Sequence, residues 1–391
     1  MICVSIGHAR HRMMIMEHQA LAKQGVELVE YRIDCIASQP QLARLLKHRP
    51  TPCIVTCRRE SDGGHWKGTE EQRLALLRSA IVSEVAYVDL EDDIAGDVPR
   101  YGKTKRIVSH HNFEETPENL EEIHSRMCEL DPDIVKLVTM AGSPADAVRI
   151  LKIVAESKVP TVGFCMGEYG IPSRILCGKY GSPFTFAAFK KGKQLAPGQL
   201  TLDEMQSLYR YDSINRETQV FGVIGDPIGH SLSPLIHNAA FQHEQLNCVY
   251  LPFRIPAGDL TQTLTEHEWL DVRGYSVTIP HKQAALDFAQ NKDPASVEIG
   301  AANTLFRDND GNWNCTNTDY NAALASLQLG LNPDVDPNQE QPDLSGKRVL
   351  MLGAGGVACA VGLGVVQSGG ELTITNRTAE RAEKLAAELK C

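Results

Sequence analysis

The sequence lacks paired cysteines. It has eleven cysteines in 391 residues, but no two stand in a CxxC spacing, and the nearest pair, Cys53 and Cys57, lies within one strand-like run. A disulfide framework or a structural zinc site would need close, repeated spacings. We therefore expect free thiols, no metal site and a reducing, cytoplasmic location.

An excess of basic residues is also missing. The formal net charge of −10 argues against a nucleic-acid or anionic-membrane partner, because either would require clustered Lys and Arg. A composition with 42% hydrophobic and 23% charged residues is typical of a soluble globular protein of two or three domains. We expect small molecules as partners, and the sequence leaves the oligomeric state open.

No targeting segment is evident, and one apolar run needs a choice between two interpretations. The chain begins as a strand at residues 2–6, so we expect no signal or transit peptide. Residues 349–366 carry no charge over eighteen positions, which is near the lower limit for a membrane span. Five glycines within this run favour a strand, a turn and a helix instead.

Short apolar runs alternate with helical periodicity over the first half of the chain. Strands are expected near residues 3–6, 26–32, 53–57, 87–90, 106–110, 134–138, 161–165 and 184–187. Helices are expected near residues 12–23, 41–47, 70–82, 118–130, 145–157 and 202–209. This alternation predicts a (β/α)8 barrel, whose working residues lie at the carboxyl ends of its strands.

One lysine is out of place in this pattern. Lys136 lies in the apolar run Asp133-Ile134-Val135-Lys136-Leu137-Val138, where a buried ammonium would be costly. Burial favours the neutral amine, which can attack a carbonyl to form an imine. The alternative is a lysine near a strand end whose ammonium reaches solvent along its aliphatic stem.

Other polar residues follow the ends of the expected strands. Glu30 and Arg32 close the second strand, Arg58 follows the third, His111 follows the fifth, and Arg174 lies in the expected loop after the seventh. One of His110 and His111 should point into the barrel mouth and move protons, while Arg58 and Arg174 could hold the carboxylate of a substrate. The set predicts imine-assisted elimination or aldol chemistry on a small acid.

Several motifs together resemble type I 3-dehydroquinate dehydratase over about residues 1–210. They are Glu30-Tyr31-Arg32-Ile33-Asp34, Cys57-Arg58, Ser109-His110-His111-Asn112-Phe113-Glu114, Asp133–Lys136, Met166-Gly167, Ser173-Arg174 and Ala196-Pro197-Gly198-Gln199. The resemblance implies an imine between Lys136 and the C3 ketone of 3-dehydroquinate, with His111 as general acid and base. It also implies substrate binding by Glu30, Arg32, Arg58, Asp62, Met166, Arg174 and Gln199.

Two positions in the barrel depart from that family's pattern. Asp62-Gly63-Gly64 stands where members often have Glu-Gly-Gly, so the carboxylate that would assist the histidine is shorter. Leu195 stands where many members have Ser, which removes one expected hydrogen bond to substrate. Neither departure touches the lysine or the histidine.

The pattern breaks near residues 212–219, and a second set of motifs follows. Ser231 and Ser233 precede a helix-starting proline, and Lys282 follows a strand that contains Thr278. Asn303 and Asp319 add an amide and a carboxylate. A glycine-rich turn, Gly353-Ala354-Gly355-Gly356-Val357, follows an expected strand and opens a helix, as in dinucleotide-binding folds.

These motifs resemble shikimate dehydrogenase over about residues 220–391. The resemblance implies that Ser231, Ser233, Thr278, Asn303 and Asp319 bind shikimate, with Lys282 and Asp319 as the catalytic pair. The turn at residues 353–357 and the segment Asn376-Arg377-Thr378 would hold NADP, because an arginine after the second strand suits a 2′-phosphate. Ser276 and Tyr320 depart from the usual Asn and Gly.

We predict three domains: a barrel over residues 1–213, a substrate-binding domain over 219–328, and a partial Rossmann domain over 346–391. Two strands and two helices make about half of a doubly wound sheet, so we expect a C-terminally truncated chain. The combined reading is a fused shikimate-pathway enzyme with 3-dehydroquinate and 3-dehydroshikimate or shikimate as small-molecule partners. The alternatives are a metabolite-sensing regulator without turnover and a class I aldolase joined to a dehydrogenase.

Overall fold

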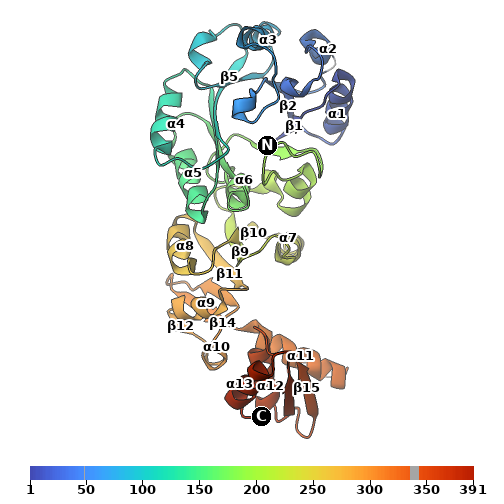
Figure 1. The fold of residues 1–391 in the computed structure, drawn as a ribbon, viewed down its shortest axis with the longest axis vertical. Helices are drawn as coiled ribbons and strands as arrows, with labels where there is room; N and C mark the ends of the chain where they lie inside the picture. The colour runs from blue at the N-terminus through green and yellow to red at the C-terminus, as the bar shows by residue number, and fades with distance from the viewer. Residues whose placement is uncertain (48, 335–342) are drawn as a thin grey trace. The chain divides into compact units, whose positions relative to one another are not determined.

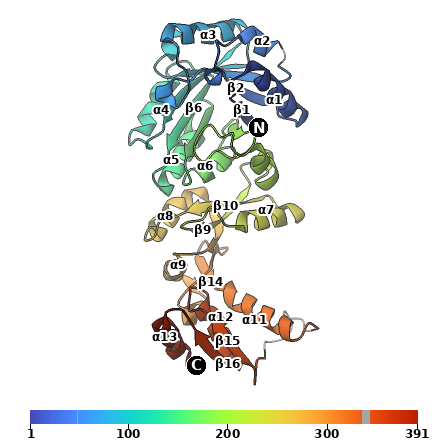
Figure 2. The same ribbon diagram turned by 45° about the vertical axis from the view of Figure 1, so that its right-hand side comes forward.

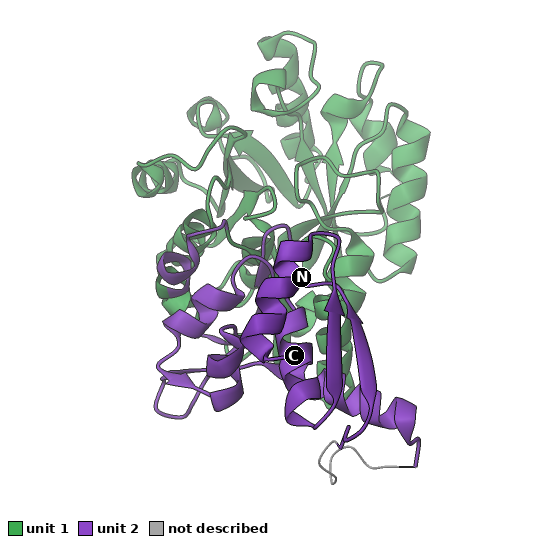
Figure 3. Ribbon diagram, turned by 60° about the horizontal axis from the view of Figure 1, so that its bottom comes forward, with its two compact units in different colours: residues 1–221, 229–255, 265–271 green, residues 222–228, 256–264, 272–391 purple. Residues whose placement is uncertain are grey.

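The computed structural model describes residues 1–47, 49–334 and 343–391. The chain divides into two compact units, which Figure 3 shows in different colours. The first unit comprises residues 1–221, 229–255 and 265–271, and the second comprises residues 222–228, 256–264 and 272–391.

The first unit contains the predicted (β/α)8 barrel. Its strands are β1 (Ile2–Ile6), β2 (Leu28–Arg32), β3 (Cys53–Thr56), β4 (Tyr87–Glu91), β5 (Lys105–Asn112), β6 (Ile134–Met140), β7 (Thr161–Met166) and β8 (Thr185–Ala188). They pair in parallel in the order β7-β6-β5-β4-β3-β2-β1-β8. Helices α1 (His11–Lys23), α2 (Leu42–Leu46), α3 (Glu70–Val82), α4 (Leu120–Cys128), α5 (Pro144–Glu156) and α6 (Ile171–Leu176) alternate with them (Figures 1 and 2).

Local sequence explains where the helices begin. Thr69 caps α3 by accepting the Gln72 N–H, and the Gln72 side chain accepts the Thr69 N–H in return. Ser143 and Pro144 start α5, because proline at a first helical position gives up an N–H that would have no partner.

Register decides which side chains share the inside of the barrel. Ser109 pairs with Lys136, Ser5 with Glu30, and Glu30 with Ile54. Because side chains alternate along a strand, His111 and Val138 then face the same way as Ser109 and Lys136. The sheet thereby gathers residues that are far apart in the sequence.

Two predicted elements of the barrel are wrong in detail. Residues 171–176 form α6, so Arg174 lies in a helix rather than in a loop. The helix expected at 202–209 is a π-helical turn, η4, at Glu204–Leu208. The first unit also holds α7 (Ser233–His243) and β10 (Cys248–Arg254), which are linked by Asn238 through hydrogen bonds to the backbone of Tyr250.

The second unit has a mixed sheet and a smaller parallel one. Strands β11 (Val272–Val277), β13 (Thr304–Arg307), β14 (Trp313–Thr316) and β12 (Asn291–Lys292) lie side by side, with the first three antiparallel and β12 parallel to β14. Its helices there are α9 (Lys282–Phe288), α10 (Pro294–Ile299) and α11 (Thr318–Leu331).

The smaller sheet has the strand–helix–strand–helix order of a dinucleotide-binding fold. Strand β15 (Arg348–Leu352) pairs in parallel with β16 (Glu371–Thr375), and α12 (Ala358–Gln367) and α13 (Ala379–Leu389) follow them. The apolar run at 349–366 is therefore a strand, a turn and a helix. Within the described part of the chain, no helix combines the length and the apolar character needed to cross a membrane.

Candidate active site

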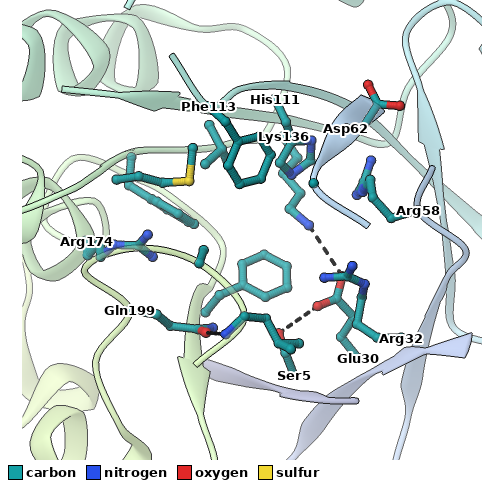
Figure 4. Close-up of a pocket in the computed structure, with 17 residues that line it drawn as sticks. Ser5, Glu30, Arg32, Arg58, Asp62, His111, Phe113, Lys136, Arg174 and Gln199 are labelled. Carbon is teal, nitrogen blue, oxygen red and sulfur yellow. Dashed lines mark hydrogen bonds and ion pairs between the residues drawn. The ribbon is translucent and has the colours of Figure 1, made fainter. Parts of the chain in front are cut away.

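A pocket opens among the carboxyl ends of the barrel strands (Figure 4). Its walls combine charged, amide and aromatic side chains. They are Ser5, Glu30, Arg32, Arg58, Asp62, Gly63, His111, Phe113, Lys136, Val138, Phe164, Met166, Arg174, Phe186, Leu195, Ala196 and Gln199. Every barrel residue that the sequence analysis selected for the site lines this pocket.

Lys136 is the buried centre of the pocket, with 5% of its surface exposed. Its Nζ lies 3.0 Å from Asp89 Oδ2 and 3.4 Å from Glu30 Oε1, and 4.1 Å from the centre of the Phe186 ring. The sequence led us to expect a neutral amine, favoured by burial within an apolar strand. Two carboxylates and an aromatic face surround it instead, so its ammonium is compensated where it stands.

Asp89 and Glu91 were missed in the sequence. Asp89 accepts hydrogen bonds from Arg58 at 2.8 Å and Ser109 at 2.6 Å, and Glu91 bonds Arg58 at 3.0 Å and Arg73 at 2.6 Å. Burial alone would raise the pKa of Asp89, but Arg58 and Lys136 draw it far below its ordinary value. The available signal was two acidic residues in alternate positions of an apolar strand.

This network changes the interpretation of Arg58. Its guanidinium is buried and already pairs with two carboxylates, Asp89 and Glu91. Arg32 is likewise bound through two nitrogens to Asp34, at 3.0 and 2.8 Å. Both arginines line the pocket, but their charges are used within the protein. The expectation that Arg58 binds a substrate carboxylate stays a prediction, and any such contact would be made by a guanidinium that is already paired.

Glu30 is held ionised beside the lysine. Its two oxygens accept hydrogen bonds from Ser5 at 2.6 Å and from Thr56 at 2.8 Å, besides the contact with Lys136. Burial by itself would raise the pKa of Glu30, but Lys136 and Arg32 lower it below the ordinary value. Glu30 is therefore a second carboxylate, besides Asp89, that stabilises the lysine ammonium.

His111 lies in β5, which pairs with β6, the strand that carries Lys136. Its side chain is partly exposed and lines the pocket. Displacement of water from the imidazole lowers its pKa well below 6.5, and the cations Arg58 and Lys136 lower it further. The ring is therefore neutral at pH 7 and able to accept a proton. Its neighbour His110 faces away, 3.3 Å from Asp92.

Arg174 is the exception among the cations that line the pocket. It is 1% exposed, its Nη2 donates to the Pro197 carbonyl at 3.1 Å, and its guanidinium lies 4.5 Å from the Phe164 ring centre. Its Nε has no partner, and over residues 1–47, 49–334 and 343–391 no carboxylate pairs with it. Burial lowers the pKa of Arg174 to about 10, which still leaves a cation at pH 7.

The segment before Gln199 covers one side of the pocket. Gln199 Oε1 accepts the Leu195 N–H at 2.8 Å, which leaves the amide nitrogen of Gln199 as a donor for another group. The Gly167 N–H donates to the Pro197 carbonyl, and this bond joins the covering segment to the turn that follows Met166. Leu195 and Ala196 add apolar contacts in the same wall.

The second unit brings Lys282 and Asp319 together. Lys282 Nζ lies 2.6 Å from Asp319 Oδ2, because the start of α9 faces the first turn of α11. Asn303 donates to Thr318 Oγ1 at 2.9 Å beside this pair, and Thr278 follows the end of β11. In the first unit, Ser231 Oγ accepts the Ser233 N–H at 3.2 Å at the start of α7.

The glycine-rich turn between β15 and α12 is open. Gly353 has φ +122°, which favours glycine, and a Cβ at Gly353, Gly355 or Gly356 would meet nothing within 4 Å. Ala354 N–H donates to Asn376 Oδ1, and Asn376 Nδ2 donates to the Thr378 carbonyl. Open backbone at a helix start, with Arg377 exposed near the next strand, fits a phosphate-bearing dinucleotide.

Among the residues that the structure describes, no group of three or more His, Cys, Asp or Glu side chains has a metal-binding arrangement.

Fold and pocket together define a (β/α)8-barrel protein with a lysine-centred pocket at the carboxyl ends of its strands. The chain belongs to the type I 3-dehydroquinase family, whose model matches residues 2–216. Two further models match the remainder: the shikimate dehydrogenase substrate binding domain at residues 223–305, and shikimate / quinate 5-dehydrogenase at 337–391.

Curated relatives combine or separate these parts. The bifunctional 3-dehydroquinate dehydratase/shikimate dehydrogenase, chloroplastic, of Arabidopsis thaliana is 36% identical over 99% of this chain and 66% of its own length. The shikimate dehydrogenase (NADP(+)) of Moorella thermoacetica is 40% identical over 45% of this chain and 56% of its own. This chain thus spans less than two thirds of either relative.

A solved structure of the dehydroquinate dehydratase and shikimate dehydrogenase from S. pombe AroM is 23% identical. It covers 99% of this chain and 76% of that chain, with a TM-score of 0.46.

Proposed function

We propose that the barrel dehydrates 3-dehydroquinate to 3-dehydroshikimate through an imine on Lys136. The observation that supports this most is the arrangement of three groups in one pocket: a buried lysine, a neutral histidine and the buried Arg174, to which the described residues offer no carboxylate partner. An α-hydroxy acid with a ring ketone matches these groups, because it presents a carbonyl, an acidic C–H and a carboxylate.

The reaction begins at the ketone carbon. The Lys136 ammonium passes one proton to the neutral ring of His111, and the freed amine bonds to C3. His111 returns that proton to the carbinolamine oxygen as water leaves, and the resulting iminium withdraws electrons from C2. Arg174 holds the C1 carboxylate by charge-assisted hydrogen bonds, and Gln199 offers its amide nitrogen to a hydroxyl. Glu30 and Asp89 stabilise the iminium cation as they stabilise the ammonium.

His111 carries the proton. Its neutral ring removes the C2 proton, the electron pair forms an enamine, and the imidazolium then protonates the departing C1 hydroxyl. The C1–O bond breaks, a C1–C2 double bond forms, and one water is released. Hydrolysis of the iminium returns the ketone and the free Lys136 amine, so the overall change is loss of water alone.

For the remainder of the chain we infer reduction of 3-dehydroshikimate to shikimate. Lys282 and Asp319, paired at 2.6 Å, would hold and protonate the reacting oxygen, and Thr278 and Asn303 of the same unit would bind ring hydroxyls or the carboxylate. Ser231 and Ser233 stay predicted substrate ligands on the basis of the sequence motif. When bound, NADPH supplies a hydride. The turn at residues 353–357 with Asn376–Thr378 would hold its phosphates, and Arg377 its 2′-phosphate.

Three further expectations from the sequence remain predictions. The domain limits 1–213, 219–328 and 346–391 rest on the sequence pattern. A cytoplasmic location and the absence of nucleic-acid or membrane partners rest on composition. The name of the Arabidopsis thaliana relative includes "chloroplastic", so fractionation of cells that make this protein is the test of its predicted cytoplasmic location.

Borohydride trapping tests the dehydratase proposal. We expect 3-dehydroquinate with borohydride to give a mass adduct on Lys136, and without borohydride to give the absorbance of a conjugated acid. The Lys136→Ala variant should give neither. An adduct without product absorbance would contradict turnover and favour a metabolite-sensing regulator, and cleavage of a carbon–carbon bond would favour an aldolase.

A further inference from the structure

The imidazole of His111 is not oriented by a hydrogen bond at Nδ1. This atom is enclosed, and it has no hydrogen-bond partner within the described residues. Asp62, a carboxylate in the pocket wall, is engaged elsewhere: it accepts from Arg59 Nε at 2.6 Å and from Ser61 at 3.1 Å. Something else must hold the ring, because a side chain that carries a proton must keep its geometry.

The aromatic ring of Phe113 lies against His111. The two ring centres are 6.3 Å apart and the planes differ by 16°, which is an offset stack. Phe113 is itself confined, because a Cβ on Gly63 would stand 2.2 Å from its Cζ. The ring fits only because residue 63 has no side chain, and Figure 4 shows Phe113 beside His111 at the pocket.

We propose that Phe113, confined by Gly63, is a positioning residue that orients His111 in the dehydration reaction, in the place of a carboxylate partner. This inference rests on the proposed dehydratase function. In this arrangement the short side chain of Asp62 pairs with Arg59. The aromatic stack with Phe113, and not a carboxylate, then orients His111.

The first test is Phe113→Leu, which keeps an apolar side chain but removes the flat face. We expect kcat for dehydration to fall about 10- to 100-fold, because a small misplacement of a proton-transfer group carries a cost of that order. KM should stay within about threefold, since Arg174 still holds the carboxylate. Phe241→Leu in α7 is the matched control and should leave both constants unchanged.

The second test approaches the same ring from Gly63. Gly63→Ala forces Phe113 to move, whereas Gly25→Ala introduces a side chain at a similar positive φ, +82° against +73°, where nothing lies within 4 Å. We expect a lower kcat only for Gly63→Ala. In a Phe113→Leu background the same substitution should cost much less, because the smaller side chain leaves room.

A pH profile separates positioning from simple packing. Arg58, Lys136, Arg32 and Asp89 are the charged groups that act on His111, and none changes in these variants. Loss of the stacked ring admits water to the imidazole, so the acid limb of kcat should move to higher pH in Phe113→Leu. Phe241→Leu should keep the wild-type profile.

Three results would overturn the inference. They are a raised KM with unchanged kcat, which would make Phe113 only a wall of the substrate pocket; additive effects of the two substitutions; and an unmoved acid limb. Failure of the dehydratase proposal looks different, because the wild-type protein would then form no Lys136 adduct and no product.

Discussion

Replacement of Arg174 by methionine should weaken substrate binding strongly without weakening the fold. Most buried arginines stabilise a protein through the carboxylates they pair with, but Arg174 has no such partner among the described residues. The contribution of Arg174 to the free energy of unfolding is therefore the unfavourable desolvation of its cation, partly offset by one backbone hydrogen bond and the stack on Phe164.

The magnitudes can be compared directly. A pKa lowered from 12.5 to about 10 corresponds to about 3 kcal/mol against the folded cation at pH 7. The hydrogen bond to Pro197 returns about 1 kcal/mol, and the contact with Phe164 about 1 kcal/mol. Arg174→Met should therefore leave the free energy of unfolding unchanged or about 1 kcal/mol higher, since methionine fills much of the same volume.

Arg58→Met is the matched comparison, because it removes an equally buried guanidinium that has partners. Asp89 and Glu91 would each lose a counter-ion, and breaking a buried pair in this way costs about 3–5 kcal/mol. The two variants should thus move the urea midpoint in opposite directions or leave a gap of several kcal/mol between them.

Two assays decide the question. Urea unfolding followed by circular dichroism measures stability, and initial rates of dehydration measure KM. Loss of a bidentate, charge-assisted contact should raise KM for 3-dehydroquinate by about 100-fold or more in Arg174→Met. Two results would contradict this prediction: an equal loss in the free energy of unfolding for Arg174→Met and Arg58→Met, or a KM for Arg174→Met equal to that of the wild type.

Two other predictions follow from buried groups. His18 contacts Tyr31 and Thr51, and burial lowers its pKa to about 4. Because the unfolded chain binds this proton from about pH 6.5 downward and the folded chain only near pH 4, the free energy of unfolding should fall by about 3 kcal/mol over that range. In urea titrations at several pH values, His18→Gln should show a smaller fall. Gly198→Ala should raise KM, because φ is +68° and the new Cβ would stand 2.7 Å from the Gly167 carbonyl oxygen. Gly192→Ala, with open space around the new Cβ, should leave KM unchanged. Equal KM values in both variants would contradict a role for the covering segment.

The barrel itself could be predicted because its signal is local. A run such as residues 134–138 is apolar and β-branched, and it became β6 with a boundary shift of two residues. Arg174 was misplaced because Gly170-Ile171-Pro172 suggests a loop, although proline is well tolerated in a first helical turn.

The partners of each charge could not be predicted in the same way. Whether Arg58 is available to a substrate depends on Asp89 and Glu91, which arrive from a neighbouring strand through the sheet register. The stack of Phe113 on His111 depends on the path of the Gly63 loop. Such contacts join segments of the chain whose spacing carries no periodic signal.

The charge inventory of the pocket explains why its substrate should be an acid as well as a ketone. An ammonium and an iminium each carry one positive charge, so Glu30 and Asp89 balance the same charge before and after the imine forms. Lysine therefore needs no new counter-ion, and among the described residues that line the pocket, the arginine without a carboxylate partner is Arg174. A ligand carboxylate would supply that partner within the pocket. A cyclic ketone that lacks the carboxylate should accordingly bind at least about 100-fold more weakly, yet still yield a borohydride adduct on Lys136 at high concentration.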